Sequence, residues 1–496
     1  MPSNRVLRVR AEGASAADLA DGVRRLQSEL GVDPAFPAEV EEAAARAASA
    51  PRLPDLDRTD LPFVTIDPEG ARDLDQALHI ERDGAGYLVH YAIADVAAFV
   101  EPGGPVDREA HRRGESLYGA DAKVPLHPTA ISEDAASLLP GQVRPALLWS
   151  IRLDAKGERT DVVVERARVR STAQHSYVEA QAMVDAGGDL PVWLTLLGEV
   201  GRLRLAREAA RGGVSLPLPE QEIDVEDGRW SLTYRRQSDV EEWNAQISLL
   251  TGFAAASLMV YARVGLLRTL PPPDPRDVQR LHRTARALEI AWPAEMLYPE
   301  FVRSLDADRP AHAAMLVACT RLLRGSGYVA FDGEVPAQPL HAALAAEYAH
   351  CTAPLRRLAD RYVGEVCVAL CAGEEVPGWV REALPGLPET MAKAARRASS
   401  YERGILDLLE ATVLRPEIGR TFDGVVIDLR SDGRGTVMLA EPAVEAPITA
   451  PADGAPLPLG EAVTVRLAAA DPATRSVAFT RVEEAGTAAR RDHPHP

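Results

Sequence analysis

Apolar residues recur at helical spacing in the first sixty positions of the chain. They follow Ser15 and Asp18, which resemble a helix-capping pair, and the periodicity stops at Gly31. The recurring positions are Leu19, Val23, Leu26 and Leu30. A second helical pattern begins at Pro37 and runs to the proline-rich stretch 51–62. The pattern therefore predicts a short helical region over residues 1–60.

The periodicity changes at Leu61, where short apolar or alternating runs begin between Asp, Gly and Pro residues. The runs are PFVTID, YLVHYAIADV and ALLWSIRL. Between about 173 and 410, helical spacing dominates, including the segments 240–267 and 356–370. Strands followed by helices are typical of an α+β domain, which we place at residues 61–415.

After Pro416 the pattern predicts five short strands separated by Gly, Pro and Asp. The strands are FDGVVIDL, GTVMLAE, APITA, AVTVRLAAAD and SVAFTRV. Five strands in so short a segment favour a small OB-type β-barrel, which we place at residues 416–484. Residues 485–496 have no periodicity, and we expect a disordered tail there.

Composition favours a folded protein of more than one domain. The chain has 496 residues, of which 46% are hydrophobic and 26% are charged. We find no signal peptide and no apolar run of membrane-spanning length, so we expect a cytoplasmic protein that contacts no membrane. Four cysteines fit a reducing compartment. Cys367 and Cys371 share a helix face, where core packing is a better interpretation than a metal site.

The net charge of −18 argues against a protein coated with basic residues for nucleic-acid binding. It does not exclude an enclosed basic channel, because net charge describes the whole surface and not one site. Local motifs must therefore decide the function.

Three aspartates stand close together where the first strand of the α+β domain ends. Asp67 ends the strand, while Asp73 and Asp75 flank one apolar residue, so that their carboxylates leave the same face of extended backbone. Converging carboxylate oxygens are the ligands that Mg²⁺ prefers. An Asp-x-Asp pair alone is also compatible with an ordinary acidic loop or with the metal site of a glycosyltransferase.

The segments around these aspartates resemble the RNase II/RNase R (RNB) family of exoribonucleases. LPFVTIDPEGARDLDQAL is similar to the family signature D-x5-D-x-D-D, and EYAHCTAPLRRLADRYV is similar to a second family segment. VHYAIADVAAFVEPGGPVDREAHRRGESLY and VPLHPTAISEDAASLLPGQVRPAL add two further matches, in the family order, over roughly residues 36–415. The resemblance implies an RNB catalytic domain, a sheet plus long helices, that degrades single-stranded RNA processively from its 3′ end. It also implies Mg²⁺ dependence, nucleoside 5′-monophosphate products and, we expect, a monomer.

The resemblance also assigns roles to individual residues. It places Mg²⁺ on Asp67, Asp73, Asp75 and Gln76, with Asp75 nearest the attacking water. It places Arg356 on the scissile phosphate. It assigns RNA contacts to Tyr177, which would stack on the 3′-terminal bases, and to Arg357 and Glu402. The competing interpretations are ion pairs on a helix surface for the arginines and Glu402, and a half-buried core aromatic for Tyr177.

Gln76 departs from the family signature, which has a fourth aspartate at this position. A neutral amide offers an oxygen to a metal but supplies no charge, so weaker Mg²⁺ binding is expected. The alternative function is a catalytically weakened or inactive RNB-like protein that binds RNA.

Both ends of the chain also invite comparison with the family. The barrel at 416–484 resembles an S1 domain, although Phe422 and Phe479 are its only candidates for stacking on bases. Its arginines, Arg420, Arg430, Arg434 and Arg466, offer RNA contacts instead.

Family members usually carry cold-shock domains at the N-terminus. Residues 1–60 are too short and too helical for these, and a helix-turn-helix module in their place is one expectation.

Overall fold

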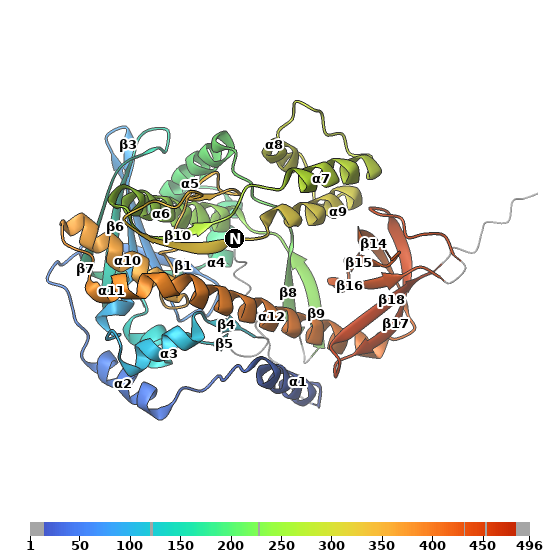
Figure 1. The fold of residues 1–496 in the computed structure, drawn as a ribbon, viewed down its shortest axis with the longest axis horizontal. Helices are drawn as coiled ribbons and strands as arrows, with labels where there is room; N and C mark the ends of the chain where they lie inside the picture. Colours follow the sequence, from blue (N-terminus) through green and yellow to red (C-terminus); the bar gives the residue numbers. More distant parts are fainter. Residues whose placement is uncertain (1–13, 120–122, 227–228, 431, 452–453, 483–496) are drawn as a thin grey trace, which may run out of the picture.

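The computed structural model describes residues 14–119, 123–226, 229–430, 432–451 and 454–482. Figure 1 shows a large body of strands and helices and a separate C-terminal β-barrel. Helix α12 (Leu387–Leu414) runs from the large body to this barrel. The predicted α+β domain followed by a small barrel is confirmed, whereas the predicted tail at 485–496 lies outside the described residues.

The N-terminal region forms two helices, α1 (Ala14–Leu30) and α2 (Ala38–Ser49), as the periodicity predicts. They pack on different parts of the molecule, α1 on α12 and α2 on α3 (Pro105–Arg113). Glycines allow α1 and α12 to approach closely, since a Cβ at Gly22 would lie 2.7 Å from Leu408 Cδ2 and one at Gly404 would lie 2.7 Å from Leu26 Cδ1. The two helices therefore serve separate contacts, and the expected helix-turn-helix arrangement is wrong.

The first strands of the large body close into a five-stranded barrel. Its strands are β1 (Phe63–Asp67), β2 (Gln76–Asp83), β3 (Gly86–Ala94), β6 (Val143–Leu153) and β7 (Arg159–Ser176). Neighbours pair in the order β1-β2-β3-β6-β7, and parallel pairing of β1 with β7 closes the ring. The register places Asp67 opposite Ser176, so the last residue of β1 lies beside the start of the following helix. The sequence predicts β1, β3 and β6, but it does not predict β2, β7 or the closure of the barrel.

Long helices cover the barrel, as Figure 1 shows. They are α4 (Tyr177–Ala186), α5 (Val192–Arg211), α6 (Asp239–Ala262) and α10 (Leu358–Ala372). Contrary to the expectation that no segment is long and apolar enough to span a membrane, α6 meets that test of length and composition. Most of α6 is buried in the fold, however, in the same hydrophobic core as Cys367, which fits a core helix of a folded domain.

Helix α6 is shorter than the apolar periodicity suggests. It ends where Arg263 adopts a left-handed conformation with φ 58°, and the chain continues as strand β10 (Val264–Thr269). Gly265, with φ 153°, permits the tight exit, since a Cβ there would lie 2.2 Å from Met259 Sδ. Strand β10 pairs antiparallel with β11 (Gly327–Asp332). The predicted helix over 264–267 is therefore wrong.

The remaining elements of the body are short. They are β4 (Leu117–Tyr118), β5 (Lys123–Val124), β8 (Glu220–Glu226), β9 (Arg229–Arg235), α7 (Pro275–Ala287), α8 (Tyr298–Arg303), α9 (Pro310–Cys319), β12 (Leu340–His341), β13 (Ala346–Glu347) and α11 (Gly378–Ala383). The pairs β4–β5, β8–β9 and β12–β13 are two-stranded sheets. Strands thus interrupt the helical region that the sequence predicts between 173 and 410.

The C-terminal barrel has the five strands that the sequence predicts. They are β14 (Thr421–Leu429), β15 (Gly435–Leu439), β16 (Val444–Thr449), β17 (Ala462–Asp471) and β18 (Ser476–Arg481). They close in the order β14-β15-β16-β18-β17. Phe479 is 1% exposed and belongs to the barrel core, so Phe422 alone of the two phenylalanines retains partial exposure.

Candidate active site

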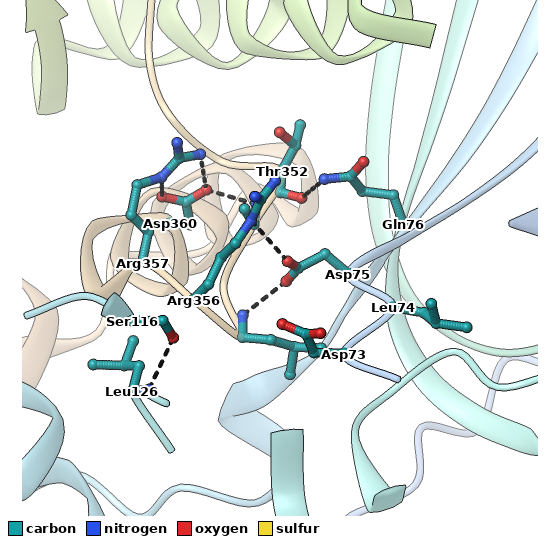
Figure 2. Close-up of polar contacts among 12 residues, drawn as sticks. Asp73, Leu74, Asp75, Gln76, Ser116, Leu126, Thr352, Arg356, Arg357 and Asp360 are labelled. Carbon is teal, nitrogen blue, oxygen red and sulfur yellow. Dashed lines mark hydrogen bonds and ion pairs between the residues drawn. The ribbon is translucent and has the colours of Figure 1, made fainter. Parts of the chain in front are cut away.

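The loop between β1 and β2 carries the acidic motif and is anchored through Leu74. The Leu74 side chain is fully buried, its N–H donates to Ser137 Oγ at 3.0 Å, and its carbonyl accepts from the Leu138 N–H at 3.0 Å. Burial of Leu74 directs the side chains on either side of it to the opposite face, as the alternation predicts. Figure 2 shows the Asp73 and Asp75 carboxylates together on that face.

Asp75 lies at the centre of the site, against the segment that precedes α10. It is 4% exposed, and its Oδ1 accepts from the Leu355 N–H at 2.8 Å, while its Oδ2 lies 3.3 Å from Arg356 Nε. Burial raises the pKa of Asp75 to about 8, although the Arg356 charge opposes this shift. The structure therefore brings together the two residues to which the resemblance assigns the main catalytic roles.

Asp67 and Asp73 complete the acidic group. Burial raises the pKa of Asp67 to about 7, Arg356 lowers it, and the negative charge of Asp73 raises it further. Asp67 Oδ2 is buried and has no hydrogen-bond partner among the described residues. A buried carboxylate oxygen without a donor is costly, which suits a position that a cation fills.

Lys123 is a residue of this site that the sequence analysis did not identify. Its Nζ lies 2.9 Å from Asp73 Oδ2 and 2.9 Å from Glu133 Oε1. Tyr118, in the strand that pairs with Lys123, is close enough for Arg356 and Asp73 to influence its pKa, which burial raises. One signal was available, since the 55 basic residues of the chain include only three lysines.

Gln76 is held away from the acidic group by two hydrogen bonds. Its Nε2 donates to the Thr352 carbonyl at 2.5 Å, and its Oε1 accepts from Tyr91 Oη at 2.9 Å. Figure 2 shows the Gln76 amide directed at Thr352, whereas Asp75 faces Arg356. In this arrangement Gln76 links β2, β3 and the segment before α10, and its expected role as a metal ligand stays a prediction.

The oxygen ligands at this site are of the type that a hard divalent cation binds, but they do not converge around one point. Carboxylate oxygens of the type that Mg²⁺ binds come from Asp67, Asp73 and Asp75. Of these, Asp67 Oδ2 has no hydrogen-bond partner among the described residues. Among the described residues, no group of three His, Cys, Asp or Glu side chains converges closely enough to hold a metal ion. In this arrangement Arg356 and Lys123 supply the positive charge that the carboxylates face.

Tyr177 lies next to the acidic group because β7 pairs with β1. It begins α4, directly after Ser176, which is the register partner of Asp67. Its Oη accepts from Asn244 Nδ2 at 2.9 Å, and burial together with the Asp67 charge raises its pKa. The ring is partly buried and packs on the main core, so both stacking on a base and core packing remain compatible with its position.

Arg357 and Glu402 lie in a second polar cluster behind Arg356. Arg357 makes two contacts of 2.8 Å with Asp360, which is 1% exposed. This local ion pair is buried and does not lie on the helix surface where the competing interpretation places it. Glu115 joins the cluster through a β-bridge to Arg357. Burial raises the pKa of Glu115 to about 7, Arg357 lowers it and Glu402 raises it. Their expected RNA contacts stay predictions.

Comparison with known families covers both parts of this architecture. The RNB domain profile matches residues 56–371, which include the three aspartates, and the RNase II-type exonuclease C-terminal S1 domain profile matches residues 420–482. These matches favour the RNB interpretation of the Asp-x-Asp pair over that of a glycosyltransferase.

Individual relatives agree with the profiles. Ribonuclease R from Escherichia coli is 28% identical over 424 residues, and Exoribonuclease 2 from Vibrio vulnificus is 26% identical over 399 residues. These alignments cover 80% and 76% of this chain but 51% and 59% of the relatives, so the chain spans about half the length of Ribonuclease R.

Solved structures show the same fold. Mycoplasma genitalium RNase R, in complex with ribose-methylated single-stranded RNA, matches with a TM-score of 0.82 at 20% identity, over 94% of this chain and 78% of that chain. Yeast Ssd1, described as a pseudonuclease, matches with a TM-score of 0.65 at 18% identity, over 84% of this chain and 51% of that chain. Because the RNB profile covers more than half of the sequence and includes the acidic motif, the chain belongs to the RNB family.

Proposed function

We propose that this protein is a magnesium-dependent exoribonuclease that hydrolyses single-stranded RNA from its 3′ end. The products are nucleoside 5′-monophosphates, released processively by a cytoplasmic monomer. Support comes from the family and from relatives named Ribonuclease R and Exoribonuclease 2. The fold is shared with Mycoplasma genitalium RNase R, which was solved in complex with single-stranded RNA.

The contact between Asp75 and Arg356 is the observation that best supports the proposal. Phosphodiester hydrolysis needs an anionic group to orient water and a cationic group to stabilise the charge that develops on the phosphate. Asp75 and Arg356 supply these groups 3.3 Å apart, and Lys123 balances Asp73 beside them. A guanidinium keeps its charge and offers several donors, which suits a phosphate.

Asp67, Asp73 and Asp75 are the residues that would hold Mg²⁺, which supplies charge neutralisation and water activation when bound. Within the chain itself, the Leu355 N–H fixes the orientation of the Asp75 carboxylate. Arg356 then binds the phosphate next to the carboxylates, and the Tyr177 ring supports the terminal bases.

A second candidate is an RNB-like protein that binds RNA without cutting it. Two observations favour it, the amide at position 76 and the fold shared with yeast Ssd1, described as a pseudonuclease. The two candidates differ in one measurable respect, because only the nuclease shortens RNA when Mg²⁺ is present.

The deciding experiment uses single-stranded RNA labelled at its 5′ end, incubated with the full chain in Mg²⁺ or in EDTA. A 3′-to-5′ exonuclease gives a ladder of labelled products that shortens with time in Mg²⁺ only. Intact RNA in both conditions, together with a gel shift that EDTA does not alter, would establish the RNA-binding alternative instead.

Asp75→Asn serves as the matched control for contaminating nuclease. The Asn Oδ1 can still accept from the Leu355 N–H, so the loop keeps its hydrogen bond while the charge next to Arg356 is lost. We expect hydrolysis to fall to background while the affinity for RNA in EDTA stays within about threefold of wild type. Cleavage by the variant at the wild-type rate would contradict the proposed role of Asp75.

A further inference from the structure

An arginine-lined groove lies between the two-stranded β10–β11 sheet and the N-terminal and central parts of α12. Its volume is about 560 Å³, and its walls include Arg268 from β10, Tyr328 from β11, and Arg396, Ser399 and Arg403 from α12. We propose that this groove, the α12 groove, binds phosphate groups of ribonucleotides. The proposal rests on the proposed function, for which it supplies a binding site outside the acidic group.

Charge is the first reason. The chain as a whole carries a net charge of −18, yet three guanidiniums line this one groove. Among the described residues, none of the three forms an ion pair at contact distance with a carboxylate. Glu115, Glu389 and Asp407 interact with Arg268, Arg396 and Arg403, respectively, only through space. Guanidiniums that form no ion pair with a carboxylate suit an anion with several oxygens.

The geometry of the walls is the second reason. Arg396, Ser399 and Arg403 are three, four and seven positions apart, so they lie along one face of α12. On the opposite wall, Arg268 donates from Nη2 to Ser326 Oγ at 2.8 Å, and its guanidinium lies 4.8 Å from the Tyr328 ring centre. Stacking on the ring orients Arg268 before any ligand arrives.

The groove also connects to the candidate active site. Tyr328 Oη and His350 Nδ1 lie 2.6 Å apart behind the groove wall. Burial lowers the pKa of His350, and the charge of the nearby Arg357 lowers it further. Arg357 adjoins Arg356, which contacts Asp75. The groove wall is therefore connected to the acidic group through Tyr328, His350 and the two arginines.

The composition of the walls indicates which part of a nucleotide is bound. Tyr328 is the one aromatic residue among the described side chains that line the groove, and Arg268 already covers its ring. The arginines and hydroxyls of the groove can bind phosphates. No lining aromatic ring is free for a base to stack on, so the groove should bind without recognising the base. Two sources supply such phosphates, the incoming RNA strand and the released nucleoside monophosphate.

The test uses the double variant Arg396→Gln/Arg403→Gln in the full chain. Glutamine keeps much of each side chain and removes two charges from the groove. The matched control, Arg24→Gln/Arg46→Gln, removes two exposed arginines that pair locally with Asp21 and Glu42. Binding of a fluorescent single-stranded RNA is measured by anisotropy in EDTA over a series of salt concentrations, and binding of AMP by equilibrium dialysis.

If the groove holds the strand, the groove variant binds RNA about tenfold more weakly near physiological salt. The slope of log affinity against log salt then falls by about 1.4, since each phosphate contact contributes about 0.7. Weaker AMP binding with unchanged RNA binding would assign the same phosphate site to the product. If both affinities equal those of the control variant, the proposal is overturned. None of these readouts needs hydrolysis, so a failure of the proposed enzymatic activity remains distinguishable.

Discussion

Arg356 Nε lies 3.3 Å from Asp75 Oδ2, which joins two motifs from distant parts of the RNB domain sequence. The neighbouring Leu355 N–H binds the same carboxylate across 280 positions of sequence. The Asp75 side chain is thus held from one side by a backbone donor and from the other by a permanent positive charge.

Replacing Arg356 should impair the chemical step more than RNA binding. We expect Arg356→Ala to lower kcat by at least about tenfold, because a charge that stabilises the transition state is lost. Arg356→Lys should recover part of this loss, since lysine restores the charge but not the planar fork. Single-turnover rates and RNA affinity in EDTA separate the two effects. A loss confined to affinity would make Arg356 a binding residue only.

The structure changes what is expected from position 76. Gln76→Asp restores the family signature, so we expect half-maximal activity at a lower Mg²⁺ concentration. The shorter side chain also gives up the donor to the Thr352 carbonyl, which should cost about 1 to 3 kcal/mol of stability because Thr352 is 3% exposed. A metal titration and a urea unfolding curve measure the two effects.

Gln76→Glu is the matched variant, because it keeps the length of the side chain and lacks the donor. It should lose stability as Gln76→Asp does. If neither substitution alters the metal titration, position 76 acts as a structural link and contributes nothing to the metal site.

Tyr177 should determine the length of the final product. Stacking on a base is worth about 1 to 3 kcal/mol, and a short RNA has few other contacts to compensate for its loss. We expect Tyr177→Ala to degrade long strands yet to release a longer end product than wild type. Tyr177→Phe keeps the ring and loses only the bond from Asn244, so its ladder should match wild type. Identical ladders for all three proteins on a denaturing gel would leave Tyr177 as a core aromatic.

The sequence predicts much of this site because its decisive features are local. Alternation around Leu74 is enough to place Asp73 and Asp75 on one face, and the strands of the C-terminal barrel follow from turn residues and period. The parallel pairing of β1 with β7 is not local, since it joins Asp67 to Ser176 across the whole first sheet. No pattern within either strand specifies that partner.

Contacts made by single side chains could not be predicted from the sequence either. Lys123 contacts Asp73 from a strand 50 positions further along the chain, and Gln76 contacts Thr352 across 276 positions. The helix-turn-helix expectation failed for a related reason. Amphipathic faces predict that α1 and α2 pack on something, but they do not say that the partners are α12 and α3.

The junction between α12 and the C-terminal barrel should be sensitive to pH. Glu410 is 6% exposed, and its Oε1 accepts from Gln221 Nε2 at 2.9 Å and from the Glu445 N–H at 3.3 Å. Burial raises the pKa of Glu410 from 4.5 to about 7, although these two hydrogen bonds lower it. The folded state therefore keeps a proton that the unfolded chain has already lost between these two values.

The free energy of unfolding should accordingly fall as pH rises from about 4.5 to 7, by about 3 kcal/mol for this group, and level off above pH 7. Glu410→Gln removes the titration. Its stability relative to wild type should therefore improve between pH 5 and pH 8, as measured by urea unfolding at both values. Glu382→Gln, on the exposed surface of α11, is the control for removing one carboxylate and should show no such change. If the difference in unfolding free energy between Glu410→Gln and wild type is the same at both pH values, Glu410 ionises equally in the folded and unfolded states. Glu410 would then not be a source of pH dependence at this junction.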